Sequence, residues 1–341
     1  MEKQTIGQQS IVFLEPPRIL CGASVVGKKE GEGPLGKYFD GVCQDPRMGT
    51  DSWEQAESTL QKEAARLAIH KAGLTNQEIR MIFAGDLLAQ SIASSYGIMD
   101  LEIPVYGLYG ACSTMGEALS LAAMTVAAGY GEYVLALTSS HFGSAEKEFR
   151  FPLEYGSQRP LSATWTVTGS GACILGRTGS HAAVTGVTTG KIVDYGLKDS
   201  MNMGACMAPA ACDTIYRNLQ DFGRKPGDYD KIITGDLGMV GQKILFDLLE
   251  EKGYDIRSQH MDCGMEIFDA KTQDTHSGGS GCGCAATVFA AYILPRIESG
   301  EWKRVLFVPT GALLSKVSFN EGQTVPGIAQ GVVVEYRKGE N

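Results

Sequence analysis

Short apolar stretches alternate with longer stretches of helical periodicity along most of the chain. Residues 53–71 carry apolar or small side chains three and four positions apart, and Gly73 then ends the predicted helix. Residues 80–84 follow as an apolar strand. The same alternation continues to the C-terminus, which predicts an α/β protein with mainly parallel central strands and helices on both faces.

The chain before this helix is more irregular. Residues 11–13 and 19–26 are apolar and are predicted to form the first strands. Residues 27–48 are rich in glycine, proline and charge, so we expect a loop there.

A repeat is the strongest organisational signal in the sequence. Residues 72–87 align with residues 222–237, and both copies place Gly-Asp-Leu after a strand, at Asp86 and Asp236. The offset between the two aspartates is 236 − 86 = 150. Such self-similarity indicates that one structural unit occurs twice.

A second alignment supports the duplication. Residues 129–138 pair with residues 300–309 at an offset of 300 − 129 = 171, and each copy runs from the end of a helix into a strand. The repeat predicts two α/β halves, residues 1–178 and residues 179–341, related by a pseudo-dyad.

The first half contains a glycine-rich turn between a strand and an apolar helix. Residues 107–116 read Gly-Leu-Tyr-Gly-Ala-Cys-Ser-Thr-Met-Gly, and residues 115–128 are apolar almost all round, which predicts a buried helix. Cys112 therefore lies at a helix N-terminus, where unpaired N–H groups and the macrodipole favour a thiolate. It is a candidate nucleophile, and a small buried apolar residue is the alternative interpretation.

Composition narrows the possible partners. With 30 Lys plus Arg against 39 Asp plus Glu, the net charge is −9, which argues against nucleic acid and against general attraction to anionic lipid. The first ten residues are polar, so no signal peptide is expected, and no apolar run approaches the roughly 18 residues of a spanning helix. The nine cysteines are expected to be reduced.

Three motifs resemble the thiolase-like superfamily, and the resemblance covers nearly the whole chain. They are the cysteine turn at residues 107–118, Phe-Ala-Gly-Asp-Leu-Leu-Ala-Gln at residues 83–90 and Thr-Val-Thr-Gly-Ser-Gly-Ala at residues 166–172. The resemblance implies a thiolase-like fold of two layered α/β halves and a homodimer formed through the N-terminal halves. By the offset of 171, Gly283 is the counterpart of Cys112, and its glycine-rich turn is expected to face the same pocket.

Condensing enzymes of this superfamily need a His and an Asn besides the cysteine, to donate hydrogen bonds to a developing enolate. The His should follow the strand at residues 231–234, where this chain has Asp236, and no Asn lies in the turn near Ser280. His276 is a candidate for the pocket, with a solvated loop histidine as the alternative. We therefore expect no catalytic residues and no enzyme, and keep an acyl-thioester condensing enzyme as the alternative.

The three motifs are similar to a sporulation branch of the superfamily that has no established condensing activity. This resemblance implies binding of pyridine-2,6-dicarboxylic (dipicolinic) acid or its calcium chelate, for uptake into the developing bacterial spore. It implies a peripheral location at the inner spore membrane, with other proteins of the same operon as partners. No cofactor and no protein metal site are expected beyond calcium carried with the ligand, and a structural subunit of a membrane transport complex is a further alternative.

Two carboxylates on a flat ring need hydrogen-bond donors and an apolar slot. The first candidates lie at the cysteine turn, where the N–H groups around Cys112 and the hydroxyls of Ser113 and Thr114 could meet an anion. Asp86 and Gln90 follow the first repeat strand and are expected at the same mouth. A helix cap is the equal alternative for Asp86, because Asp236 repeats it.

The remaining ligand-binding candidates come from later segments: His141 after the strand that follows the Cys112 helix, together with Ser280 and His276. A core or surface histidine is the alternative for His141. Residues 144–159, which include Lys147 and Arg150, form either a lid over the pocket or a surface excursion.

Overall fold

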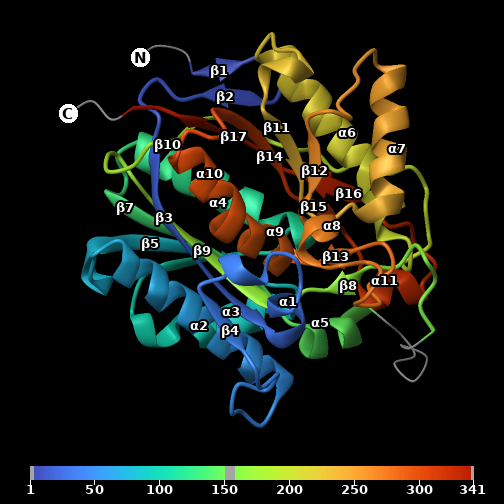
Figure 1. The fold of residues 1–341 in the computed structure, drawn as a ribbon, viewed down its shortest axis with the longest axis horizontal. Helices are drawn as coiled ribbons and strands as arrows, with labels where there is room; N and C mark the ends of the chain where they lie inside the picture. The colour runs from blue at the N-terminus through green and yellow to red at the C-terminus, as the bar shows by residue number, and fades with distance from the viewer. Residues whose placement is uncertain (1–3, 150–157, 339–341) are drawn as a thin grey trace.

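The computed structural model describes residues 4–149 and 158–338, and its principal sheet repeats one strand order on both sides of a central junction. The order is β12-β11-β14-β17-β10 on one side and β3-β9-β7-β5-β6 on the other (Figure 1). In chain order the first half contains β3 (Arg18–Gly27), α2 (Trp53–Lys71), β5 (Ile79–Gly85), α3 (Ile92–Ile98), β6 (Val105–Leu108), α4 (Thr114–Ala127), β7 (Tyr133–Ser140), α5 (Phe142–Phe149) and β9 (Gly169–Gly176).

The second half repeats this succession. It contains β10 (Ala182–Thr188), α6 (Met203–Asp221), β11 (Lys231–Thr234), α7 (Gly238–Glu251), β12 (His260–Asp262), α8 (Cys263–Ile267), α9 (Cys282–Val288), α10 (Leu294–Glu298), β14 (Arg304–Val308) and β17 (Gly331–Tyr336). β5 pairs in parallel with β6 and β7, as β11 does with β12 and β14, and the last strand of each half is antiparallel. Asp86 and Asp236 thus follow equivalent strands, as the repeat predicts.

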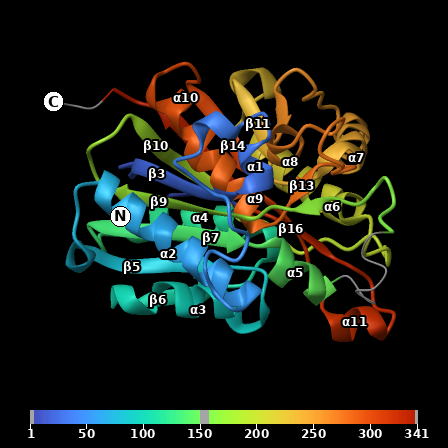
Figure 2. The ribbon, with the colours of Figure 1, turned by 60° about the horizontal axis from the view of Figure 1, so that its bottom comes forward.

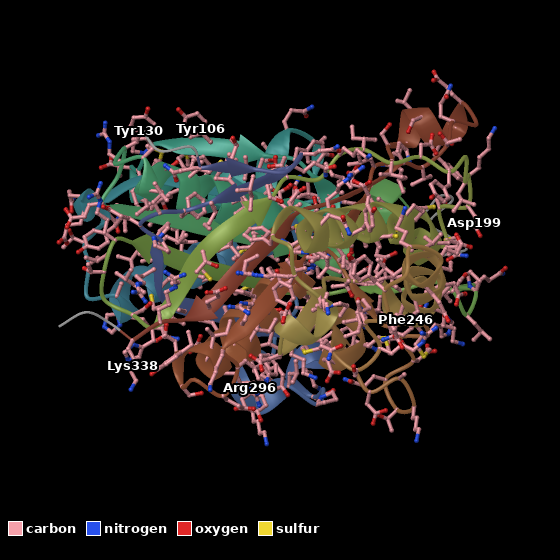
Figure 3. All side chains as sticks on the ribbon, turned by 90° about the horizontal axis from the view of Figure 1, so that it is seen from above. Tyr106, Tyr130, Asp199, Phe246, Arg296 and Lys338 are labelled. Atoms are coloured by element: carbon pink, nitrogen blue, oxygen red, sulfur yellow. The ribbon has the colours of Figure 1, made fainter. Side chains whose placement is uncertain are left out.

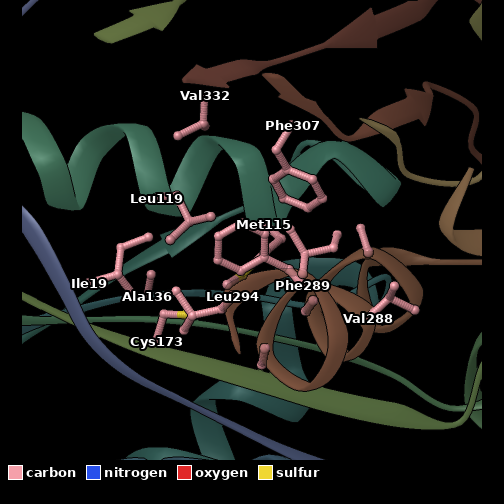
Figure 4. Packing of buried hydrophobic residues seen from close by; sticks show 14 of the residues in the cluster. Ile19, Met115, Leu119, Ala136, Cys173, Val288, Phe289, Leu294, Phe307 and Val332 are labelled. Atoms are coloured by element: carbon pink, nitrogen blue, oxygen red, sulfur yellow. The ribbon is translucent and has the colours of Figure 1, made fainter. Parts of the chain in front are cut away.

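Helices cover the sheet on both faces and also fill the middle of the molecule. α2 packs on β3 and β9, while α4 and α9 contact strands from within the fold (Figure 2). Small side chains permit the close approach of α9, since a Cβ placed on Gly171 of β9 would lie 2.4 Å from the carbonyl group of Ala286. Figure 4 shows the central packing, in which α4 meets the second half. The fully buried side chains there include Met115, Leu119, Phe289, Phe307 and Val332.

The structure differs from the sequence-based expectation near the N-terminus. Residues 27–48 are not only a loop, because they include α1 (Lys28–Gly31) and β4 (Gly41–Cys43), and β4 pairs in parallel with β3. β1 (Thr5–Ile6) and β2 (Ser10–Val12) form a hairpin that joins β10, so the first residues complete the sheet of the second half. The predicted boundary at residue 179 lies in the turn between β9 and β10.

β6 is the outer strand of the first half, and apolar side chains beside it are exposed. Val105 is 49% and Tyr106 60% exposed, with Tyr96 at 61% and Met99 at 62% nearby. Figure 3 shows Tyr106 projecting from this edge. An unpaired strand edge with exposed apolar side chains is a surface suited to pairing with another chain.

We propose that the protein forms a homodimer through this edge, so Val105→Lys should shift it to monomer in sedimentation velocity at micromolar concentration. A charge at a paired edge opposes association. Val317→Lys, at another exposed apolar position on α11 (Lys316–Asn320), should leave the sedimentation coefficient unchanged. A wild-type protein that sediments only as monomer would contradict the prediction.

Candidate functional site

A cavity of about 310 Å³ opens where the two halves meet above the Cys112 turn. Cys112 lies in a short 3-10 turn, Ala111–Ser113, that runs directly into α4. Ala111 has a positive φ of 51°, a conformation uncommon for a residue with a side chain. The residues that line the cavity come from both halves: Leu87, Tyr109, Ala111, Cys112, Met203, Ser280, Ala312, Leu313, Leu314, Ser315 and Ser318.

The thiol of Cys112 lies near the carboxyl group of Asp236, which follows β11 of the second half and whose charge acts on the thiol. Asp236 is 1% exposed and accepts two hydrogen bonds, from the Gly281 N–H at 2.9 Å and from the Thr310 hydroxyl at 2.8 Å. Burial raises the pKa of Asp236 to about 7, although the hydrogen bonds act in the opposite direction.

These contacts correct the expectation of an activated thiolate at Cys112. Burial is the main cause that raises the pKa of this thiol well above its usual value, and the adjacent Asp236 carboxylate raises it further. The favourable helix N-terminus does not overcome a buried negative neighbour. Cys112 is therefore a protonated thiol beside Asp236.

Ser113 and Thr114 do not face the cavity, so the expectation that their hydroxyls meet a ligand is corrected. Both side chains are fully buried. The Ser113 hydroxyl donates to the Gly110 carbonyl at 2.7 Å, and the Thr114 hydroxyl donates to the Ala111 carbonyl at 2.6 Å. They stabilise the turn that presents Cys112.

Asp86 and Gln90 are also placed away from the cavity. Asp86 is fully buried and accepts from the N–H of Leu88 and from the N–H and hydroxyl of Ser94, at 2.6 to 2.8 Å. These contacts fix the start of α3, so Asp86 has the helix-capping role that was the alternative interpretation. Gln90 is exposed and has a positive φ of 56°. The repeat correctly placed Asp86 after its strand, but the hydrogen-bond donors to Asp86 are nearby groups of Leu88 and Ser94.

His141 lies at a different cavity, of about 640 Å³, beside Trp53 and Trp165. It is 2% exposed, its Nε2 donates to the Pro46 carbonyl at 2.8 Å, and its Nδ1 accepts from the Gly143 N–H at 3.0 Å. Burial lowers its pKa. His141 is thus a structural histidine in an aromatic cavity, and the expectation that it borders the Cys112 pocket is corrected.

His276 is likewise absent from the Cys112 cavity. Its Nδ1 lies 2.9 Å from the Pro160 carbonyl and its Nε2 lies 3.1 Å from the Asp274 carboxylate. Part of the predicted lid forms α5, where Lys147 pairs with Glu54. Residues 150–157, including Arg150, lie outside the described residues.

Ser280 is the second candidate that the structure places in the cavity beside Cys112. It ends β13 (Gly279–Ser280), which pairs with β8 (Trp165–Thr166) of the first half. Gly283 itself packs elsewhere, because its N–H donates to the Ser140 hydroxyl at 3.2 Å. The second glycine-rich turn therefore meets the cavity through Ser280.

Several lining residues were not predicted from the sequence. Leu314, Ser315 and Ser318 come from the segment that enters α11, and Met203 begins α6. The Ser315–Ser318 capping box was a readable signal for the start of a helix, but nothing in the sequence placed that helix over Cys112.

Within residues 4–149 and 158–338, no group of three or more His, Cys, Asp or Glu side chains could hold a metal ion. The Cys282 thiol donates to the Ser139 carbonyl at 2.9 Å, and the Cys284 thiol lies 3.7 Å from the Gly235 carbonyl.

The duplicated sheet and the buried cysteine turn define the thiolase-like fold. The fold is similar to that of 3-oxoacyl-[acyl-carrier-protein] synthase III from Aquifex aeolicus VF5, with a TM-score of 0.57 and 15% identity over 94% of this chain and all of that one. The tetronic acid condensing enzyme AbyA1 gives a TM-score of 0.60 with 17% identity over 93% and 99% of the two chains. At such identities the likeness establishes the fold alone.

The chain belongs to the stage V sporulation protein AD family. The family model matches residues 7–335. The stage V sporulation protein AD of Bacillus subtilis (strain 168) is 42% identical over 329 residues, which cover 96% of this chain and 97% of that protein.

Buried carboxyl groups with raised pKa values make the folded protein bind protons that the unfolded chain releases. Asp236 is one, and burial also raises the pKa of Glu30 to about 7 and of Glu57 to about 8. Their stabilising contribution is complete below the unfolded pKa of about 4 and is lost as the pH rises through the folded values.

We therefore expect thermal unfolding by circular dichroism to show falling stability between about pH 5 and pH 8. Asp236→Asn should reduce this fall by about 1–3 kcal/mol, because it removes one group that must ionise while buried. Asp255→Asn is the matched control, since Asp255 is exposed and its pKa is lowered by the Arg257 backbone N–H. Stability that rises over this range in both wild type and Asp236→Asn would refute the assignment.

Proposed function

We propose that this chain is a non-catalytic binding protein for pyridine-2,6-dicarboxylic (dipicolinic) acid or its calcium chelate, acting in uptake into the developing spore. The observation that carries the proposal is the buried Asp236 beside Cys112, which leaves a cavity without a nucleophile. Membership of a sporulation protein family supports the setting.

Condensation is the alternative, because the structural neighbours include condensing enzymes. A developing enolate must be met by hydrogen-bond donors. At this position the chain has Asp236, which already accepts from Gly281 and Thr310 and, in its ionised form, would repel the enolate. The site therefore disfavours the reaction on electrostatic grounds.

The cavity suits a ligand with little net charge. Its described lining residues are apolar or carry hydroxyls, from Tyr109, Ser280, Ser315 and Ser318, and none of them is charged. A free dianion would enter without a counter-charge at an unfavourable desolvation cost. In the calcium chelate the metal offsets both carboxylates, so we expect the chelate to be the preferred species.

The proposed setting is peripheral, at the inner spore membrane with other proteins of the stage V sporulation A operon. Among the described residues, none of the helices combines the length and apolarity that crossing a membrane requires. Attachment through protein partners is consistent with this finding, and pull-down of those proteins from spore membranes with the tagged chain would test it.

Calorimetric titration with dipicolinate should show saturable binding that is tighter with calcium. Cys112→Trp should abolish it by filling the cavity, and Ser280→Ala should weaken it by about 0.5–1.5 kcal/mol through loss of one hydrogen bond. Val317→Trp, at a 67% exposed position of α11 outside the lining, should bind as the wild type does.

Circular dichroism must show that each variant remains folded. Unchanged affinity in Cys112→Trp would exclude the Cys112 cavity and shift attention to the aromatic cavity around Trp53 and Trp165. Absence of binding by the wild-type protein would overturn the proposed function itself.

The purified protein should neither condense nor decarboxylate acetyl or malonyl thioesters, because no donor replaces the missing His and Asn. Product formation is measured by mass spectrometry of the thioesters, with a 3-oxoacyl synthase as the positive control. Turnover that disappears in Cys112→Ala would establish the enzyme instead. Slow acylation of Cys112 without a condensation product would not establish an enzyme.

A further inference from the structure

A separate hollow of about 550 Å³ lies at the far end of the fold from the Cys112 cavity, where β3 begins and β17 ends. It is bounded by the turn between β9 and β10 and by the last turn of α4. None of its described lining residues is shared with the Cys112 cavity. The lining includes four basic side chains, of Arg18, Arg177, Arg337 and Lys338.

The charge of this hollow is opposite to that of the whole protein. Glu15 is the one acidic residue among its described lining residues, against four basic residues, in a chain whose net charge is −9. The basic side chains therefore outnumber the carboxylates in the lining four to one. Like charges close together cost free energy unless an anion joins them.

Internal contacts account for only part of this cluster. Arg18 donates to the Arg337 carbonyl at 2.9 Å, and the Arg337 guanidinium lies 3.5 Å from Glu335, which also pairs with Arg304. Within the described part of the chain, Arg177 has no hydrogen-bond or ion-pair partner and its side chain is exposed.

The end of α4 does not require these arginines either. The carbonyls of Met124, Thr125 and Val126 accept from the N–H groups of Ala128, Tyr130 and Gly129 at 2.9 to 3.0 Å. The last turn of the helix is therefore satisfied by backbone groups. Among the described residues, the guanidinium donors of Arg177 therefore remain available to a ligand.

We propose that this basic hollow binds a multiply charged oxyanion of the phosphate class. A guanidinium presents parallel N–H donors that match two oxygens of one anion. Three arginines and a lysine offer more donors than one carboxylate can accept, whereas a phosphate or pyrophosphate group has three or more oxygens and at least two charges. The Thr178 and Ser180 hydroxyls line the same hollow and can donate as well.

The proposal is independent of the Cys112 cavity, and its test uses the full chain. Calorimetry with inorganic pyrophosphate probes a free oxyanion, and sedimentation with phosphatidylglycerol vesicles, against phosphatidylcholine vesicles, probes a lipid headgroup. We expect at least one probe to bind, with an affinity that falls as salt rises.

The double variant Arg177→Gln with Arg337→Gln should weaken that binding about tenfold or more, since two charge-assisted contacts are removed. The matched control is Lys243→Gln with Arg257→Gln, which changes the net charge equally, on α7 and in the segment that follows it. α7 lies on the opposite side of the molecule (Figure 1). The control should bind within about twofold of wild type, as expected for screened distant charges.

Pyrophosphate binding alone identifies a soluble source, and vesicle binding identifies a headgroup, and either supports the assignment. Binding of neither probe overturns it, as does an equal loss in both double variants, which would indicate a general charge effect. Loss of dipicolinate binding in the arginine variant, with pyrophosphate binding intact, would reassign the hollow to the dicarboxylate. Dipicolinate titration of the same variants distinguishes failure of this proposal from failure of the proposed function.

Discussion

The position of the buried Asp236 carboxyl group beside Cys112 determines what the central cavity can do. A buried carboxylate loses several kcal/mol of hydration, and here the Gly281 N–H and the Thr310 hydroxyl replace part of the lost water. Both donors come from the second half and Cys112 comes from the first, so this carboxyl group lies where the two halves meet. Removing the carboxyl group would relieve the thiol of a charged neighbour, but it would also leave the Gly281 and Thr310 donors without their acceptor.

The duplication makes this arrangement easier to understand. Asp86 and Asp236 follow equivalent strands and are equally buried, but their partners differ. Asp86 binds the backbone at the start of α3, within its own half, while Asp236 reaches across to Cys112 of the other half. One copy of the repeated residue therefore stabilises a local turn, and the other sets the electrostatics of the shared cavity.

The sequence predicted the architecture well because the relevant signals are local or repeated. The helix over residues 53–71, the turn at Cys112 and the equivalence of Asp86 and Asp236 follow from periodicity and a constant offset. Side-chain directions in the site were predicted poorly, because Ser113 and Thr114 share the turn with Cys112 but point into it. The cavity wall from α11 depends on a distant loop, and the basic hollow depends on bringing residues 18, 177 and 337 together. The net charge of the chain alone could not reveal the basic hollow.

The N-terminal hairpin constrains the order in which the chain can fold. Val12 of β2 pairs with Gly186 of β10, a separation of 186 − 12 = 174 residues. During synthesis β2 leaves the ribosome long before β10 exists, so it must wait without its partner strand. α9 also comes from the second half and packs on β9 of the first. The first half can therefore form its strands early, but burial of its inner face is deferred until the second half arrives, as expected for a topology rich in distant contacts.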